Sequence, residues 1–271
     1  MPGLGWLADL AKEPDEKPDW DAGELLGAVQ YPLEHSAARL ILSILSQGPL
    51  SSCVANAGFQ AIRADHVRQG VDHPILGSRQ FGYFVARAIH NATHEDRGTY
   101  IRLFFEALNK FGFPPEEAWP YLFDMLKGKP RWSVMPATAA FQQAFDQKSP
   151  VAYRRIFETG SARVDAVKRA IANDRCVVFG TLIADDFVRS ILDFTKPISP
   201  PEPDEPIAGG HAMVLCRYTA NSIGGPNSWG ENWGADGWFD MAPEYIAWDG
   251  SKDFWIAENV PKYAAPQEVA G

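Results

Sequence analysis

Cysteine is scarce in this chain, which has 271 residues and three cysteines, Cys53, Cys176 and Cys216. Three scattered thiols exclude a disulfide scaffold and a cysteine zinc site, so the fold must depend on a hydrophobic core. This usage fits a reducing compartment. Cys176 and Cys216 lie in the apolar runs CVVFGTLIA and HAMVLCRY, where a cysteine is expected to behave as a small buried hydrophobe.

The chain also lacks an excess of positive charge and long apolar runs. A formal net charge of −9 and a pI of about 5.2 argue against a surface that tracks phosphates, so no nucleic-acid partner is expected. No apolar run is long enough to span a bilayer, so no membrane partner is expected. The start, MPGLGWLADL, does not resemble a secretory signal. We expect a cytoplasmic protein, or one exported by a route without a recognisable N-terminal signal peptide.

The first residues carry much of the negative charge. Two lysines, Lys12 and Lys17, face a set of carboxylates within the first 24 residues: Asp9, Glu13, Asp15, Glu16, Asp19, Asp21 and Glu24. We therefore expect residues 1–30 to form an acidic, solvated arm. Hydrophobic residues make up 46% of the chain, enough for a substantial core, so residues 31–271 are expected to form one globular unit.

Hydrophobic periodicity divides this unit into two halves. Apolar positions recur at helical spacing over residues 51–70, 81–88 and 101–111, the last ended by Gly112 and Pro114. Runs typical of strands occupy residues 176–184, 211–218, 237–241 and 254–260. A proline-rich stretch between the first two runs indicates a surface loop that leads directly into His211. The first half is thus predicted to be largely helical and the second largely sheet.

The segment QGPLSSC, from Gln47 to Cys53, places a cysteine at the start of a predicted helix. The N-terminus of a helix favours an anion through its unpaired N–H groups and its dipole, and the thiolate is the reactive form of cysteine. Cys53 is therefore the candidate nucleophile. The Gln47 amide, together with the Cys53 backbone N–H, is the candidate donor to an oxyanion. Taken alone, the segment leaves open that Cys53 is an ordinary buried cysteine.

Two downstream segments supply the other side chains that a reaction of this cysteine would need. His211 follows two glycines at the head of an apolar strand, and Asn227 opens the run NSWGENWGADGW. An amide can fix the tautomer and plane of an imidazole, while indoles such as Trp229 and Trp233 exclude water. Each segment alone also fits a structural histidine or a tight turn in a sheet. The order Cys, His, Asn over this spacing indicates nucleophilic catalysis with Cys53.

These segments resemble the papain family of cysteine peptidases. Six positions separate Gln47 from Cys53, sixteen separate His211 from Asn227, and Ser-Trp-Gly then Trp-Gly follow. Further stretches are similar to the bacterial branch of the family: GWLADL near the start, SSCVANA at 51–57, SRQFGYFVAR at 78–87, and RGTYIRLFFEALNKFGF followed by WPY. The resemblance covers most of residues 1–250.

The resemblance implies an α+β, two-lobe fold. A helical lobe over about residues 45–135 would carry Cys53, and an antiparallel sheet or barrel lobe over about 136–260 would carry His211 and Asn227, with the active-site cleft between them. The implied activity is hydrolysis of peptide bonds in a peptide or protein substrate, without a metal or organic cofactor. The residues implied to contact substrate are Thr181, Ala212, Gly98 and Trp229, and the main specificity pocket is expected to take an apolar side chain.

The sequence departs from the family pattern at three places. Val54 stands where many papain-like enzymes have an aromatic residue, Gly210 where a carboxylate often precedes the histidine, and Leu50 where many secreted members have a cysteine. None of these removes a catalytic group. Two alternatives stay open: acyl transfer or amide hydrolysis on a non-peptide substrate, and a catalytically weak fold that serves as a peptide-binding or effector module.

The N-terminal arm has a further implied role. Papain-like peptidases are usually silenced by an N-terminal pro-segment lying in the cleft. Residues 1–30 are a candidate short pro-segment, an intramolecular inhibitory arm anchored by Trp6, Leu7 and Leu10. The alternative is an arm packed on the surface away from the cleft.

Overall fold

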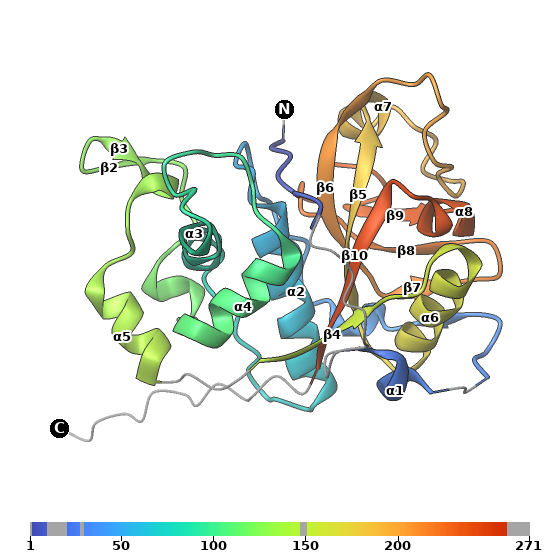
Figure 1. Cartoon of the computed structure of the whole chain (residues 1–271), viewed down its shortest axis with the longest axis horizontal. Helices are drawn as coiled ribbons and strands as arrows, with labels where there is room; N and C mark the ends of the chain where they lie inside the picture. The colour runs from blue at the N-terminus through green and yellow to red at the C-terminus, as the bar shows by residue number, and fades with distance from the viewer. Residues whose placement is uncertain (1, 10–20, 28–29, 147–150, 259–271) are drawn as a thin grey trace.

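The structure is a computed structural model of the chain and describes residues 2–9, 21–27, 30–146 and 151–258. A helical lobe and a sheet lobe lie side by side (Figure 1). Within the described ranges, no helix combines the length and apolar character needed to cross a membrane. Leu10, one of the expected anchors of the arm, lies outside the described residues.

The helical lobe is organised around one central helix. Its helices are α2 (Cys53–Arg68), α3 (Arg79–Ile89), α4 (Ile101–Phe111) and α5 (Thr138–Asp146), with a small hairpin of β2 (Met125–Leu126) and β3 (Lys129–Pro130) and the short 3-10 turns η2 (Glu116–Ala118) and η3 (Arg131–Ser133). The central helix, α2, is rich in alanine and buried on most sides. Its Gly58 allows close packing, because a Cβ there would lie 2.2 Å from the ring of Phe104 on α4.

The sheet lobe contains two four-stranded sheets in which neighbouring strands run antiparallel. The first has the order β4 (Ala152–Ile156), β10 (Ser251–Glu258), β5 (Val177–Ala184) and β6 (Ile207–Leu215). The second has the order β1 (His35–Ser36), β7 (Arg217–Tyr218), β8 (Ile223–Pro226) and β9 (Trp238–Met241). The remaining elements are α1 (Gly23–Leu26), η1 (Ala38–Leu40), α6 (Gly160–Ala172), α7 (Asp185–Arg189) and α8 (Pro243–Ala247).

The predicted α+β class and two-lobe arrangement are confirmed by this architecture. The helix expected over 51–70 begins at Cys53, and the strand expected at 211–218 begins earlier, at Ile207, because the two glycines before His211 continue the pairing with β5. The helical lobe also extends further than expected. α5 packs beside α4, with Ala140 and Ala144 buried in the same cluster, so this lobe continues past the boundary expected near residue 135.

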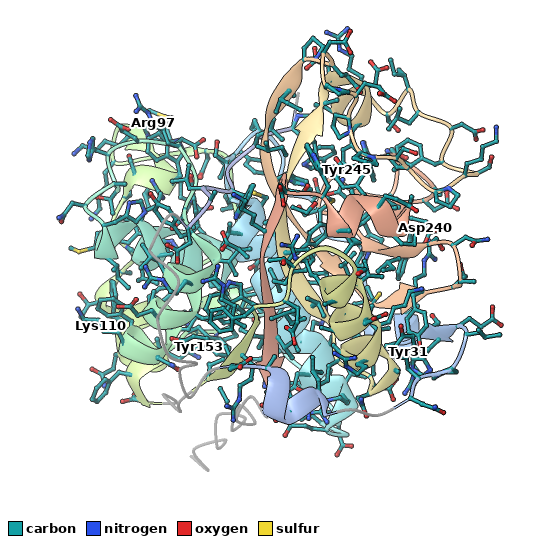
Figure 2. The ribbon with its side chains drawn as sticks, turned by 45° about the vertical axis from the view of Figure 1, so that its right-hand side comes forward. Tyr31, Arg97, Lys110, Tyr153, Asp240 and Tyr245 are labelled. Atoms are coloured by element: carbon teal, nitrogen blue, oxygen red, sulfur yellow. The ribbon has the colours of Figure 1, made fainter. Side chains whose placement is uncertain are left out.

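The two lobes meet where α2 packs against β6. The start of the helix and the strand that carries His211 therefore face each other from opposite lobes. Residues 2–9 run between the lobes at this junction (Figure 1). From a second direction, Arg97 and Lys110 lie on the helical lobe, and Asp240 and Tyr245 lie on the sheet lobe (Figure 2).

Candidate active site

Cys53 is the first residue of α2, and its side chain is fully buried. Burial raises the pKa of its thiol to about 11, although backbone N–H groups of Ala212, Gly5, Val54 and Cys53 itself act in the opposite direction by favouring the thiolate. The helix start supplies two of these donors, Cys53 and Val54, while the other two come from β6 and the N-terminal segment. In this closed environment their effect is smaller than the cost of desolvation, so the thiol keeps its proton at neutral pH.

His211 on β6 and Asn227 after β8 form a close pair. Nε2 of His211 donates to Oδ1 of Asn227 across 2.8 Å. The same Oδ1 accepts from the backbone N–H of Ser228 at 2.7 Å, and the Asn227 N–H donates to the carbonyl of Gly237 at 2.8 Å. These bonds direct the amide oxygen toward the ring, so the proton of a neutral imidazole belongs on Nε2. Nδ1 is then its basic nitrogen.

Aromatic side chains enclose this pair. The indole of Trp229 stacks on His211 with centroids 4.4 Å apart and 29° between the planes, and Trp233 meets Trp229 edge to face at 5.2 Å. Phe187 packs on Trp233 at 4.9 Å. Burial lowers the pKa of His211 to about 4, while the bond to Asn227 acts in the opposite direction. The imidazole is therefore neutral at neutral pH.

The thiol and the imidazole occupy adjoining positions without forming an ion pair. The sulfur faces the N–H of Ala212, the residue next to His211. Among the described residues, however, Nδ1 of His211 has no hydrogen-bond partner. The structure thus brings both groups to the same junction, where burial favours their uncharged forms.

The side chain of Gln47 is buried in the loop that precedes α2. Its Oε1 accepts from the hydroxyl of Ser228 at 2.6 Å. The backbone N–H of Gln47 donates to the backbone carbonyl of Ser228 at 2.8 Å. Its Nε2 donates to the carbonyls of Gly3 and Leu50, both at 2.8 Å. The amide is therefore oriented with its NH₂ group toward the N-terminal arm, and it joins the helical lobe to the turn after Asn227.

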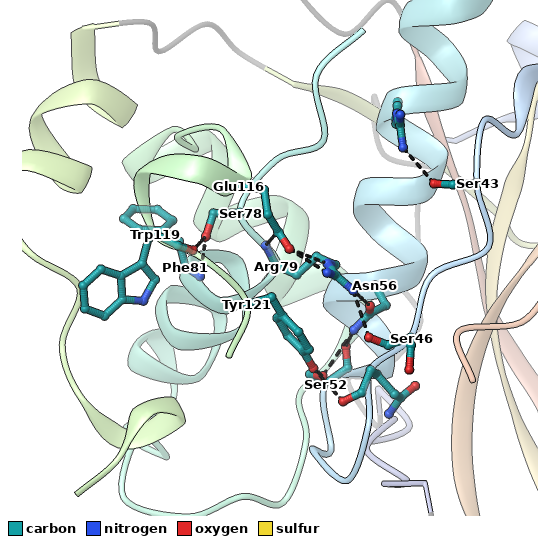
Figure 3. Close-up of polar contacts among 12 residues, drawn as sticks. Ser43, Ser46, Ser52, Asn56, Ser78, Arg79, Phe81, Glu116, Trp119 and Tyr121 are labelled. Atoms are coloured by element: carbon teal, nitrogen blue, oxygen red, sulfur yellow. Dashed lines mark hydrogen bonds and ion pairs between the residues drawn. The ribbon is translucent and has the colours of Figure 1, made fainter. Parts of the chain in front are cut away.

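Arg79 on α3 anchors the same loop from behind. Its Nε and Nη2 donate to Oε1 of Glu116 at 3.0 and 2.6 Å. Its Nη1 donates to the carbonyl of Ser46 at 3.1 Å and to Oδ1 of Asn56 at 2.9 Å (Figure 3). One guanidinium thus connects α3, α2 and the residue before Gln47, a use that suits the fixed fork geometry of arginine.

Tyr121 completes this polar network. Its hydroxyl donates to the carbonyl of Gln47 at 3.0 Å and is hydrogen-bonded to the hydroxyl of Ser52 (Figure 3). Its ring lies under the guanidinium of Arg79 at 4.2 Å. The loop from Gln47 to Cys53 is therefore fixed at both ends by side chains of the helical lobe.

Residues 2–9, the described start of the expected N-terminal arm, lie across this junction and are hydrogen-bonded to both lobes. From here on, these residues are called the arm. The N–H of Trp6 donates to the carbonyl of Gly210 at 3.2 Å on the sheet side. On the helical side the N–H of Thr99 donates to the carbonyl of Gly5 at 2.9 Å, and the N–H of Leu7 donates to the carbonyl of Thr99 at 3.1 Å. Of the expected anchors, Trp6 is buried and Leu7 is partly buried.

Comparison with known proteins shows which family the chain is related to. The chain is 33% identical over 226 residues to an uncharacterised peptidase C1-like protein of Acanthamoeba polyphaga mimivirus, a match that covers 81% of this chain and 70% of that protein. The chain belongs to the papain-like cysteine peptidases. No protein-family model matches the sequence. The predicted family and enzyme class, a cysteine-dependent hydrolase, are confirmed.

Solved structures of papain-like peptidases share the fold. Xylellain, a cysteine protease from Xylella fastidiosa, superposes with a TM-score of 0.78 at 26% identity, over 96% of this chain and 97% of that one. Procathepsin B S9 from Trypanosoma congolense superposes with a TM-score of 0.67 at 13% identity, over 96% and 87% of the two chains.

The residues that this papain-like chain was expected to use for substrate lie around the same junction. A Cβ at Gly98 would lie 1.8 Å from the carbonyl oxygen of Gly5. Because glycine has no side chain, the backbone of the arm can pass close to residue 98. Ala212 offers its N–H to the thiol, and Trp229 covers the imidazole. Thr181 pairs with His211 on the neighbouring strand, and its hydroxyl is bonded to Ser251. Their contact with substrate stays a prediction.

Three residues near the junction were not singled out from the sequence. Arg79 and Tyr121 hold the Gln47 loop, and Asp253 of β10 is buried against the arm. A charged residue inside the apolar run of β10 is a local signal that could have drawn attention to Asp253. Among the described residues, no cluster of three or more His, Cys, Asp or Glu side chains could hold a metal ion.

Proposed function

We propose that this papain-like peptidase hydrolyses peptide bonds with Cys53 as nucleophile, His211 as general base and acid, Asn227 as the residue that orients the ring, and Gln47 as an oxyanion donor. The observation that carries the proposal is the 2.8 Å bond from His211 to Asn227, beside a thiol at the start of α2. Because Nε2 is bonded to Asn227, the basic Nδ1 lies on the opposite edge of the ring. Proton transfer from Cys53 requires such an unprotonated ring nitrogen.

The proposed reaction proceeds in two halves. Nδ1 of His211 takes the thiol proton, and the Cys53 thiolate attacks the carbonyl carbon of the substrate. The carbonyl oxygen becomes an oxyanion, stabilised by the Gln47 amide and the Cys53 N–H. As the C–N bond breaks, His211 gives its proton to the leaving amine. A water molecule then attacks the thioester, His211 accepts the water proton, and the released thiolate recovers it.

We also propose that residues 3–9 hold the enzyme in a latent state. The carbonyl of Gly3 occupies the Nε2 of Gln47, which the reaction needs for the oxyanion. The Cys53 sulfur faces the backbone N–H of Gly5, so the arm occupies the position beside the thiol that a substrate backbone would need. Procathepsin B S9, which shares this fold, is by its name a proform, and a latent state of the present chain would be of the same kind.

Burial gives the latent state an electrostatic component. Desolvation raises the pKa of Cys53 to about 11 and lowers that of His211 to about 4. A thiolate and an imidazolium are both disfavoured where water is excluded. Removing the arm admits water to the junction, and we therefore expect the pKa of Cys53 to fall and that of His211 to rise until the thiol is the stronger acid of the two, so that the ion pair forms.

Removal of the arm tests both proposals. Deleting residues 2–9 leaves α1 in place, together with Ala22 before it; Ala22 and Leu26 are both buried in the core. We expect the shortened chain to cleave a fluorogenic peptide and to be labelled at Cys53 by a small epoxide faster than the full chain. Cys53→Ser should abolish labelling, and Cys216→Ser should preserve it as the matched control.

The outcomes separate the alternatives. No gain in rate on deletion would contradict latency. Labelling of Cys53 with turnover of a simple amide or ester, but of no peptide, would favour acyl transfer on a non-peptide substrate. No labelling of Cys53 in either chain would contradict the peptidase mechanism and favour a peptide-binding module.

A further inference from the structure

A small cavity adjoins Asn227 where the two lobes meet. We call it the Asn227 cavity. The helical lobe contributes Gln60 of α2 to its wall, and the sheet lobe contributes Ala212 of β6, Pro226 at the end of β8, and Asn227 itself. These four residues are buried. The centre of a water molecule can lie within about 10 Å³ of this space, which is room for one molecule.

The amide of Asn227 is held at one end. Its Oδ1 accepts from Nε2 of His211 at 2.8 Å and from the backbone N–H of Ser228 at 2.7 Å. A backbone N–H can only donate, so the bond from Ser228 fixes which end of the amide is the oxygen. The NH₂ group is therefore at the other end. Among the described residues, this buried Nδ2 has no hydrogen-bond acceptor.

Gln60 brings an atom of the opposite kind to the same cavity. The residue is 5% exposed, and its Nε2 donates to the backbone carbonyl of Ser43 at 2.8 Å. A carbonyl can only accept, so this bond fixes the orientation of the Gln60 amide and leaves Oε1 at the other end. In the part of the chain that the structure describes, Oε1 is buried and has no hydrogen-bond donor.

A buried donor and a buried acceptor thus adjoin one cavity without being bonded to each other. Leaving both unpaired is costly, and buried water molecules typically satisfy such groups. A water molecule can accept from Nδ2 of Asn227 and donate to Oε1 of Gln60. Pro226 in the wall has no N–H to offer to Oε1. The other polar side chains of the wall, Asn56 and Ser228, are hydrogen-bonded elsewhere.

Resting on the proposed function, we propose that Gln60 is a positioning residue for Asn227 and acts through one buried water molecule in the Asn227 cavity. The amide is then held at both ends, by His211 and Ser228 at its oxygen and by the water at its nitrogen. This fixes its plane and its distance from the imidazole, and small displacements of such groups lower the rate. Gln60 itself touches no reacting atom.

The first test is the rate at which a small epoxide labels Cys53 in the full chain, followed by intact mass spectrometry. Reagent concentrations are chosen at which the rate is proportional to concentration, so that departure of the arm is not rate-limiting. Gln60→Met keeps the length of the side chain and removes its acceptor. We expect labelling to slow about fivefold, the effect of one hydrogen bond. Gln60→Glu keeps an acceptor oxygen and should keep most of the rate.

Gln80→Met is the matched control. Gln80 lies on α3, is 1% exposed, and has no hydrogen-bond partner for its amide atoms within the described ranges. The substitution therefore makes the same chemical change in a buried glutamine outside the Asn227 cavity, and the labelling rate should stay the same. An equal loss of rate in Gln60→Met and Gln80→Met would overturn the role of Gln60.

A double substitution separates positioning from a purely structural role. Asn227→Ala removes the amide that Gln60 is proposed to hold, so adding Gln60→Met to that chain should not slow labelling further. If Gln60→Met slows labelling equally with and without Asn227, Gln60 does not act through the amide and the inference is overturned.

A crystal structure of the unsubstituted full chain tests the bridge directly, whether or not the variants fold. We expect a water molecule at about 3 Å from both Nδ2 of Asn227 and Oε1 of Gln60. Two amides bonded to other groups, with no water between them, would overturn the inference.

Failure of this inference is distinct from failure of the proposed function. Undiminished labelling of Cys53 in the Gln60→Met chain would overturn the role of Gln60 and leave Cys53 as the nucleophile. No labelling of Cys53 in any of these chains would overturn the proposed peptidase mechanism itself.

Discussion

The two sides of the candidate active site are held by different interactions. On the helical side, charged and polar contacts of Arg79 and Tyr121 fix the loop that carries Gln47. On the sheet side, the His211–Asn227 pair lies among stacked aromatic rings. Directional bonds set the position of a backbone loop, whereas aromatic packing excludes water from one hydrogen bond. We therefore expect the helical side, with the proposed nucleophile Cys53, to be sensitive to geometry, and the sheet side, with the proposed base His211, to be sensitive to hydration.

The largest effect is expected on the helical side, from Cys53→Ser in the chain lacking residues 2–9. A hydroxyl ionises far less readily than a thiol, so kcat/KM for a fluorogenic peptide should fall about 10⁴-fold. Cys216→Ser, which changes a buried cysteine away from the junction, is the matched control and should retain activity. Loss of activity in the control alone would contradict the assignment.

The next effect concerns the sheet side. Asn227→Ala removes the acceptor of the 2.8 Å bond from His211, so the ring loses its fixed plane and tautomer. We expect kcat to fall about 10²-fold with a smaller change in KM. Asn227→Asp restores an acceptor and adds a charge, which raises the pKa of His211. Asn227→Asp should recover part of the lost kcat, and the pH dependence of kcat should shift to higher pH. An unchanged pH dependence would contradict direct contact between residue 227 and the His211 ring.

A smaller effect is expected from the network behind Gln47. Arg79→Ala removes four hydrogen bonds to Glu116, Ser46 and Asn56, and the loop carrying Gln47, the proposed oxyanion donor, should become less ordered. We expect kcat/KM of the shortened chain to fall about tenfold, mainly through kcat. Arg79→Lys should not rescue it, because a lysine lacks the forked geometry. A lower thermal stability with unchanged kcat would show a purely structural role.

The smallest effect concerns hydration of the base. The folded pKa of His211, about 4, lies below its unfolded value of 6.5. The unfolded state therefore binds more protons, and this contribution to stability is present above pH 6.5 and is lost as the pH falls toward 4. Trp229→Ala exposes the ring and should weaken this dependence. Thermal unfolding of the full chain and the variant between pH 7 and 4 measures it; parallel curves would contradict the role of Trp229.

Much of the site was predictable because its parts have local signatures. Cys53 precedes a helical pattern, and His211 and Asn227 stand at a strand start and in a glycine and tryptophan run, so their order and spacing indicated the chemistry. The family, fold and enzyme class predicted from them are confirmed. The roles of the four catalytic candidates stay proposals that the geometry supports.

Other features depend on contacts between distant segments. Asp253 is one carboxylate within a strand, and its position opposite Trp6 follows from the path of the arm and a bulge in β10. Arg79 is one arginine on a helix until α2, α3 and the Glu116 turn assemble around it. The extent of the helical lobe likewise depends on the packing of α5 against α4.

The pH dependence of Cys53 alkylation tests the central claim most directly. The full chain, with a thiol pKa of about 11 beside the arm, should react slowly at neutral pH and faster only as the pH rises. The chain lacking residues 2–9 should react rapidly at neutral pH, where a thiolate paired with imidazolium is the nucleophile. Equal rates and equal profiles for the two chains would contradict a nucleophile kept latent by its own N-terminus.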